Sequence, residues 1–294
     1  MKQNQVGYIV TATNVAREMA VLHRLQSVLL RVGALGTLIA MLAGFFLAGR
    51  AMRPIRQAWQ RQIQFVADAS HELRTPLAVI QSNLDIVLDH SDQSVLDNLE
   101  WINNAHREAR RLAKLVEDLL TLARSDSQTA TVQRQPVDLT KLVQHVVELF
   151  ETIAMAKRLE LEADLPGEIH IMGDPDRLHQ LFVILLDNAC KYTPEGGKVR
   201  VTVALERNIA VVQIEDTGQG IAEADVNRVF ERFFRADEAR HRGTGGVGLG
   251  LAIAKWIVEA HQGKIMLQSK LGEGTRVTVK LPVRSAEHAQ RPSL

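Results

Sequence analysis

The sequence predicts a multidomain protein with one transmembrane helix, an antiparallel helical hairpin and a compact α/β domain. Three observations support this fold class. Residues 32–49 form an uncharged apolar run, and two helices with one apolar stripe each flank a polar turn. From residue 137 onward the hydrophobic spacing changes to a mixture of helix and strand. With 294 residues, 46% of them hydrophobic, the chain is long enough to build one or two cores.

The apolar run VGALGTLIAMLAGFFLAG is flanked by Arg31 and Arg50. Eighteen helical residues measure about 27 Å, close to the hydrocarbon thickness of a bilayer. A core helix or a signal peptide usually needs a shorter run, so we predict a transmembrane helix at 28–49. Four arginines within twelve residues favour a cytoplasmic location for the C-terminal side. We therefore expect a single-pass protein of the cell membrane, with residues 1–27 as a short extracytoplasmic or membrane-proximal segment that is too short for a folded sensor domain.

Two amphipathic helices follow the predicted span, separated by the polar turn DHSDQS at residues 89–94. The first helix has apolar residues three or four positions apart: Val66, Ala69, Leu73, Leu77, Ile80, Leu84 and Val87. The second helix, predicted at 94–123, shows a heptad seam that only Asn98 interrupts. Each stripe needs a partner surface. We therefore predict a hairpin at 65–124 that pairs with a second copy in a dimeric four-helix bundle.

The polar, aperiodic residues 125–136 predict a linker. Both periodicities occur beyond it, with helices near 142–150 and 178–190 and strands near 199–205, 209–214 and 277–281. The continuous apolar run IAVVQI is typical of a strand that is covered on both faces. We expect a compact α/β domain at 137–284, followed by a frayed tail at 285–294.

The overall charge and the cysteine content exclude several classes of function. The formal net charge is +1, which argues against nucleic acid as a partner, because nucleic-acid-binding domains usually carry a basic excess. Cys190 is the one cysteine, so the chain has neither an internal disulfide nor a cysteine-built zinc site. The ten histidines lack the spacing of metal ligands.

Three glycine-bearing clusters lie in the last domain: DTGQG at 216–220, GTGGVGLGLAI at 243–253 and LGEGT at 271–275. Five glycines at the start of a predicted helix let a ligand approach the backbone, and amide groups at a helix start favour anions. The pattern is neither a P-loop nor a dinucleotide fingerprint. Asn188 and Lys191 share one helical face and offer an amide oxygen for a hard cation and an ammonium for a phosphate. Alone they would be an ordinary helix end; together with the glycines they predict a phosphate-bearing ligand.

Five motifs occur in the order found in bacterial sensor histidine kinases of two-component systems, which the chain resembles from about residue 50 to 284. They are FVADASHELRTPL, LLDNACKYTP, EDTGQGI, VFERFFRAD and GGVGLGLAI. The resemblance implies a dimerisation and histidine phosphotransfer domain at 65–124 and a catalytic ATP-binding domain of the GHKL type, an α/β sandwich, at 137–284. The stretch AMRPI resembles the start of a signalling module, and residues 50–64 would be a truncated, HAMP-like juxtamembrane helix.

The resemblance also implies the reacting groups. His71 matches the histidine that accepts the γ-phosphate of ATP, Glu72 its acid/base partner, and Thr75 a residue that aids dephosphorylation of the partner protein. His71 lies opposite the apolar stripe, so we expect it to face solvent, where a nucleotide domain can reach its neutral lone pair. Thr75 stacks one turn beyond it. Pro76 cannot donate a hydrogen bond to the carbonyl of Glu72, which predicts a bend there.

The nucleotide site follows in the same way. Asn188 matches a Mg²⁺ ligand, Lys191 and Tyr192 neighbouring nucleotide contacts, and Asp216 the carboxylate that hydrogen-bonds the adenine amino group. The other nucleotide and lid positions are Gly218, Gly220, Arg235, Gly246, Gly248, Leu249 and Gly250. We expect the basic stretch 230–242 to form a lid over the nucleotide, with a solvated loop as the alternative. The sequence departs from the family at Ile184, where many members have asparagine, and at Val247, where threonine or serine is frequent.

We therefore expect an ATP- and Mg²⁺-dependent protein-histidine kinase that is a homodimer in the membrane, passes phosphate from His71 to a response regulator and also acts as the phosphatase of that regulator. One alternative is a non-catalytic dimeric adaptor. Another is an ATPase that works like the related chaperones and topoisomerases.

Overall fold

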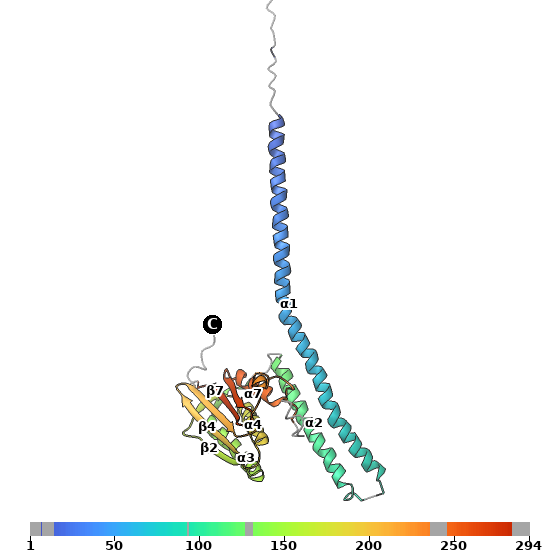
Figure 1. Ribbon diagram of the computed structural model, residues 1–294, viewed down its shortest axis with the longest axis vertical. Helices are drawn as coiled ribbons and strands as arrows, with labels where there is room; N and C mark the ends of the chain where they lie inside the picture. Colours follow the sequence, from blue (N-terminus) through green and yellow to red (C-terminus); the bar gives the residue numbers. More distant parts are fainter. Residues whose placement is uncertain (1–6, 8–14, 93, 127–131, 236–245, 284–294) are drawn as a thin grey trace, which may run out of the picture. The chain divides into compact units, whose positions relative to one another are not determined.

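A computed structural model describes residues 7, 15–92, 94–126, 132–235 and 246–283 (Figure 1). The chain divides into two units, residues 1–66 and 67–294. The elements are α1 (Val15–Asp89), α2 (Leu99–Asp126), β1 (Gln135–Asp138), α3 (Leu139–Ala156), β2 (Glu160–Asp164), β3 (His170–Gly173), α4 (Pro175–Tyr192), β4 (Lys198–Glu206), β5 (Ile209–Asp216), α5 (Glu223–Val226), α7 (Gly250–Ala260), β6 (Lys264–Lys270) and β7 (Gly274–Pro282). The predicted tail at 285–294 lies outside the described residues.

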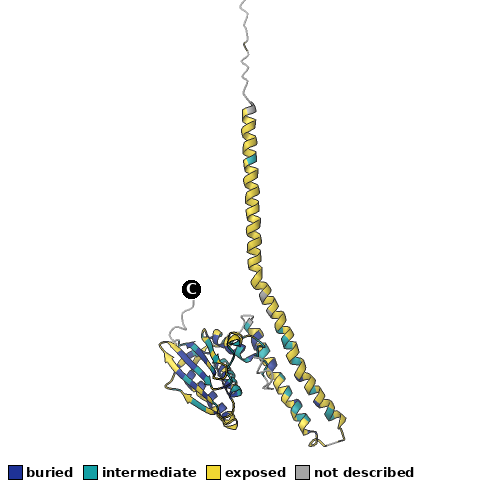
Figure 2. Ribbon diagram, in the orientation of Figure 1, coloured by how far each residue is buried: buried dark blue, intermediate teal, exposed yellow. Residues whose placement is uncertain are grey.

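Helix α1 contains the predicted transmembrane run. An 18-residue window within it has a mean hydropathy of 2.0, and none of that window is buried. Figure 2 shows the N-terminal part of α1 almost entirely exposed, and Phe45 is 85% exposed. Such an exposed apolar surface is unfavourable in water and suits a lipid environment. Among the described residues, α1 is the one helix long and apolar enough to cross a membrane.

The hairpin turn differs from the prediction at its second helix, because regular helix begins at Leu99 and not at Ser94. Ser94 and Asp97 explain the difference. The Asp97 amide donates to Ser94 Oγ at 3.3 Å, and the Ser94 amide donates to Asp97 Oδ2 at 3.2 Å, an arrangement that resembles a capping box. Asn98, which is 4% exposed, donates from Nδ2 to the carbonyls of His90 and Ser94. The residue that interrupts the seam therefore stabilises the turn.

The predicted apolar stripes of α1 and α2 remain partly uncovered in a single chain. Leu77 is 47% exposed and Leu84 46% on α1, and Val95 ahead of α2 is 71% exposed. Large apolar side chains in a row at this exposure are typical of an unpartnered interface. The stripes are thus available to a second copy of the hairpin.

The α/β domain has two layers. Its sheet has the order β2-β4-β5-β7-β6, in which β2 pairs parallel to β4 and the other neighbours are antiparallel. Helices α3, α4 and α7 cover one face and share with it a core that includes Phe182, Ile253 and Val201. The other face carries exposed ion pairs such as Arg200–Glu162, which contribute little stability. The two strands predicted from alternation are confirmed as β4 and β7, and the strand predicted from the apolar run IAVVQI is confirmed as β5.

A second sheet consists of the short antiparallel pair β1 and β3. Strand β1 begins at Gln135, so regular structure starts within the predicted linker. Asp138 then caps α3 by accepting a hydrogen bond from the Lys141 amide at 3.1 Å. Strand β3 leads through Asp174 into α4. Asp174 accepts from the Arg177 amide at 3.2 Å, and Pro175 occupies the first helical position, which fixes where α4 begins.

Candidate functional site

The α/β domain contains a cavity of about 340 Å³ between α4, the ends of β5 and β7, and the glycine-rich segment before α7. This volume is in the range of small-molecule sites. The cavity is lined by ten of the eleven residues predicted for the nucleotide: Asn188, Lys191, Tyr192, Asp216, Gly220, Arg235, Gly246, Gly248, Leu249 and Gly250. Residues from four separate sequence motifs therefore meet at one site.

Asp216 ends β5 and presents its carboxylate at the cavity. Its Oδ1 accepts hydrogen bonds from the amides of Gly218 at 2.8 Å and of Thr275 at 3.3 Å. Burial raises the pKa of Asp216 to about 6, although the two hydrogen bonds oppose this rise. Such a group can accept a hydrogen bond from a ligand amino group near neutral pH.

Gly218 is the predicted residue that does not line the cavity, and it acts through Asp216. A Cβ at this position would lie 2.6 Å from Asp216 Oδ1 and 2.6 Å from the Tyr192 carbonyl oxygen. Only glycine permits this close approach of β5 to the end of α4.

Asn188 and Lys191 project from the last turn of α4. Burial lowers the pKa of Lys191, the charge of Arg235 lowers it further, and Asp187 opposes both. A Cβ at Gly246 would lie 2.7 Å from Lys191 Nζ, so the glycine-rich backbone passes close to the ammonium. The set fits Mg²⁺ with a triphosphate, because Mg²⁺ in nucleotide sites takes few protein ligands beside phosphate oxygens and water. Asn188 would supply the amide oxygen, and Lys191 would neutralise phosphate charge.

Gly248 shapes the turn that leads into α7. Its φ of +80° belongs to the left-handed region, and a Cβ would lie 2.7 Å from the Phe234 carbonyl oxygen. The Gly248 carbonyl accepts a hydrogen bond from the Phe233 amide at 2.9 Å. The FERFFR segment is thus held against the glycine turn, and Arg235 at its end reaches the cavity. Residues 236–242 of the predicted lid, and Gly243 and Gly245, lie outside the described residues.

Several cavity residues were not predicted as ligands. Thr275 is brought in by the pairing of β5 with β7, in which it lies opposite Asp216. The motif LGEGT, which ends at Thr275, was the available sequence indication. Apolar walls come from Ile214, Ile221, Val229, Leu267 and Val277, and α2 contributes Arg111, Lys114, Leu115 and Asp118. Ile184 and Val247, the two departures from the family pattern, also line the cavity.

The predicted reacting groups lie elsewhere, on α1. His71, Glu72 and Thr75 are all exposed, which confirms that His71 faces solvent. The Thr75 hydroxyl donates to the His71 carbonyl at 3.5 Å, one helical turn away. None of the three lines the cavity. The described arrangement therefore presents an accessible imidazole and a separate ligand site that are not in contact.

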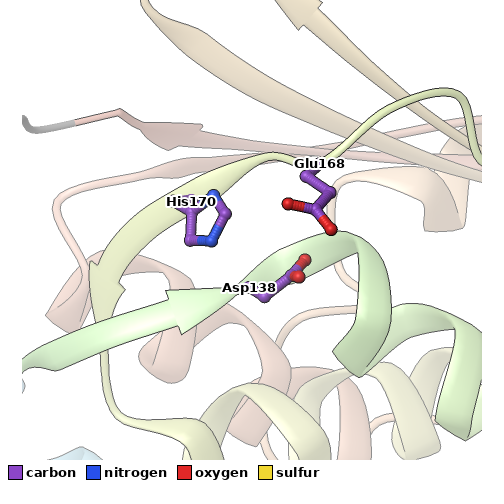
Figure 3. A group of neighbouring side chains, drawn as sticks. All are labelled: Asp138, Glu168 and His170. Atoms are coloured by element: carbon purple, nitrogen blue, oxygen red, sulfur yellow. The ribbon is translucent and has the colours of Figure 1, made fainter.

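A second group of polar side chains could hold a metal by composition. Asp138, Glu168 and His170 face one another from the end of β1, the loop before β3 and β3 itself (Figure 3), with potential ligand atoms within 4.8 Å of one another. Lys141 Nζ lies 2.9 Å from Asp138 Oδ2 and 3.1 Å from Glu168 Oε1. An ammonium already neutralises these carboxylates at the start of α3. We regard this group as a helix-capping cluster.

Comparison with family models identifies two regions of the chain. Residues 61–128 match a model described as the His Kinase A (phospho-acceptor) domain. Residues 173–285 match a model described as the histidine kinase-, DNA gyrase B- and HSP90-like ATPase. The first region contains His71, and the second contains the residues of the cavity named above from Asn188 onward.

Two known histidine kinases are similar to this chain in sequence. The chain is 40% identical over 242 residues to the sensor histidine kinase RppB of Synechocystis sp. The matched region covers 81% of this chain and 53% of RppB. It is 37% identical to the signal transduction histidine-protein kinase BaeS of Escherichia coli, over 76% of this chain and 47% of BaeS. The chain thus spans about half the length of these relatives.

Two solved structures have a similar fold. The Acinetobacter baumannii histidine kinase AdeS has a TM-score of 0.61 at 27% identity, over 73% of this chain and 98% of that one. Full-length ShkA in complex with AMPPNP has a TM-score of 0.57 at 27% identity, over 76% of this chain and 46% of ShkA.

Proposed function

This chain belongs to the sensor histidine kinase family, and from that premise we propose that it is an ATP-dependent protein-histidine kinase. A nitrogen of the His71 imidazole attacks the γ-phosphorus of ATP, the bond to the bridging oxygen breaks, and ADP leaves. The phosphoryl group then passes to an aspartate of a response regulator. One observation carries the proposal: a single chain holds an exposed imidazole in a phospho-acceptor domain and a cavity that gathers Asn188, Lys191 and Asp216.

The cavity residues suit the binding of ATP. Asp216 would accept a hydrogen bond from the adenine amino group, and the Lys191 ammonium would meet phosphate oxygens. Mg²⁺, when bound at Asn188, would neutralise charge on the phosphates. The solved complex of ShkA with AMPPNP, an ATP analogue, supports a nucleotide in a related fold.

The residues around His71 would serve transfer and its reversal. The exposed imidazole can approach a nucleotide in line, as phosphoryl transfer requires. Glu72 would hold the imidazole in its reactive tautomer, and the Thr75 hydroxyl would position a water that removes phosphate from the response regulator.

The assembly would be a homodimer anchored in the membrane. The partly exposed stripe that includes Leu77 and Leu84 supports pairing of two hairpins. The apolar part of α1 supports a single membrane span, and the arginines that follow it favour a cytoplasmic catalytic region. The domain limits would be those expected from the sequence, with β1 added to the catalytic domain.

The proposal is tested with the full chain in detergent micelles, γ-labelled ATP and Mg²⁺. Wild type is expected to gain a label that acid removes and alkali does not. His71→Gln should abolish the label, whereas His106→Gln, at an exposed histidine of α2, should keep it. Nucleotide binding without any label would favour the adaptor. Steady ATP hydrolysis that His71→Gln leaves unchanged would favour an ATPase of the chaperone type.

A further inference from the structure

His261, just beyond the C-terminal end of α7, is a buried histidine outside the nucleotide cavity, with 4% of its surface exposed. Its Nδ1 lies 2.7 Å from the Ile257 carbonyl oxygen, and its Nε2 lies 2.9 Å from the Asp174 amide nitrogen. The backbone passes so close that a Cβ at Gly173 would lie 3.0 Å from the ring. The imidazole therefore joins the end of α7 to the residue that caps α4.

The two partners determine the protonation state of this ring. A carbonyl oxygen only accepts, so Nδ1 must carry the proton, and a backbone amide only donates, so Nε2 must offer its lone pair. A protonated imidazole would direct an N–H of Nε2 at the N–H of Asp174, and the bond would be lost. The contact exists only with the neutral ring.

The same two helices meet again at the cavity. A Cβ at Gly250, the first residue of α7, would lie 3.2 Å from Ile184 Cγ2 of α4. Ile184 is ten residues after Asp174, about 15 Å along α4, and Gly250 is eleven residues before His261, about 16 Å along α7. The spacings match, so the helices run antiparallel with one contact at each end. Between these, the Arg177 guanidinium lies 5.5 Å from the Trp256 ring centroid.

The residues that face the nucleotide site sit at the far ends of this helix pair. Asn188 and Lys191 lie among the last five residues of α4, and Gly248 lies two residues before the start of α7. The register of α4 against α7 therefore sets the distance between the glycine turn and the polar end of α4.

We propose that neutral His261 is a positioning residue for nucleotide binding, which holds α4 and α7 in register from the end remote from the cavity. This role rests on the proposed function, because it concerns the same nucleotide. It also makes the register sensitive to pH. The charged groups that act on the ring are Arg134, which precedes β1, and Asp174. Burial lowers the pKa of His261 and the charge of Arg134 lowers it further, whereas the hydrogen bond to the Ile257 carbonyl and the charge of Asp174 oppose this shift. The bond should persist at neutral pH and open in acid.

The first test reads the bond itself, in the full chain without nucleotide. Hydrogen exchange of the Asp174 amide, corrected for its intrinsic pH dependence, is compared at pH 7.5 and 5.5. In wild type, the protection of the Asp174 amide should be at least tenfold lower at pH 5.5 than at pH 7.5. His261→Gln should lose none, because its amide oxygen can accept from Asp174 and does not titrate. His145→Gln, at an exposed histidine of α3, should behave like wild type. Protection that is equal at both pH values in wild type, or that falls equally in His261→Gln, would overturn the proposal.

The second test reads nucleotide affinity at pH 7.5 with a fluorescent ATP analogue. His261→Phe removes the acceptor and should weaken binding at least fivefold, whereas His261→Gln should stay within twofold of wild type. Wild-type affinity in a folded His261→Phe protein would overturn the positioning role. If His261→Phe does not fold, the exchange comparison with His261→Gln decides. A wild type that binds no nucleotide would overturn the proposed function, and the exchange of Asp174 would still report on the bond.

Discussion

Asp216 Oδ1 accepts a 2.8 Å hydrogen bond from the amide of Gly218, two residues further along the chain. The bond orients a carboxylate that burial makes unfavourable, since the pKa of Asp216 rises to about 6. A buried charge without a counter-ion costs stability, and its retention in a cavity is typical of a binding site.

We predict that Asp216→Asn stabilises the nucleotide-free protein and weakens nucleotide binding. Above pH 7 the substitution removes a buried charge. The free energy of unfolding of the catalytic domain should therefore rise by on the order of 1–2 kcal/mol, and its Tm should rise with it. Nucleotide affinity should fall at least tenfold, because an amide NH₂ would meet the adenine amino group donor to donor. Thermal denaturation and titration with a fluorescent ATP analogue measure the two effects.

Glu215→Gln is the matched control for this substitution. Glu215 is the preceding residue of β5, points to the opposite face and pairs with Arg276 at 2.7 Å. The substitution Glu215→Gln should leave nucleotide affinity unchanged. Lower stability together with wild-type nucleotide affinity in Asp216→Asn would contradict this role of Asp216.

Nucleotide affinity should fall as the pH drops through about 6. The raised pKa means that Asp216 becomes protonated there, well above its ordinary range, and the proton occupies a lone pair that the adenine would use. The stability contribution of this group has the opposite sign. It is present below the ordinary pKa of 3.8 and is lost as the pH rises through about 6. Nucleotide affinity is measured from pH 8 to 5 in both proteins. The fall in affinity near pH 6 should be present in wild type and absent in Asp216→Asn. The same fall in Asp216→Asn would assign the titration to another group.

Two glycines with the same backbone conformation give a matched pair of variants. Gly248 has φ +80° and Gly272 φ +81°, but a Cβ meets the Phe234 carbonyl at 2.7 Å only at Gly248, and nothing within 4 Å at Gly272. Gly272→Ala should cost about 1 kcal/mol of stability from the left-handed conformation alone. Gly248→Ala should in addition weaken nucleotide binding at least tenfold, because the turn must move. Equal affinities of the two variants, measured by titration, would contradict this.

Strand periodicity predicted β4 and β7 of the large sheet because alternate side chains there are buried, but it did not predict the edge strands β2 and β6. Val199, Val201 and Val203 of β4 are all at most 1% exposed. The small sheet escaped prediction because four-residue strands carry too little alternation: Gln135 and Pro136 appear as linker in sequence but pair with Gly173 and Met172. Such short strands form because two segments far apart in the sequence pair with each other, and local periodicity does not show this.

The site was predictable where one motif carries its own chemistry, as at Asn188 and Asp216. Thr275 was not, because only the register of β5 with β7 brings its amide to Asp216. Helix α2 began later than its periodicity indicated because the side chains of Ser94 and Asp97 bond to local backbone and form a separate turn.

We predict that Leu84→Glu converts the dimer to monomers. Leu84 is 46% exposed in a single chain and lies on the predicted stripe, so a charge there would be buried without a partner in the bundle. Light scattering of the detergent-solubilised chain measures the mass. Ser82→Glu, at an exposed position on the opposite face of α1, should remain dimeric. A dimeric Leu84→Glu protein would place the interface elsewhere.

The central claim is that His71 accepts the phosphoryl group, and locating the phosphate on the protein tests it most directly. After reaction with ATP, trypsin releases residues 62–74, in which His71 is the one histidine and Ser70 is its neighbour. The peptide is kept at neutral pH, because acid removes the label, and is then fragmented by electron transfer in a mass spectrometer. The fragments should place an added phosphate on His71 and none on Ser70. Phosphate on Ser70, or on a peptide that does not contain His71, would contradict the account.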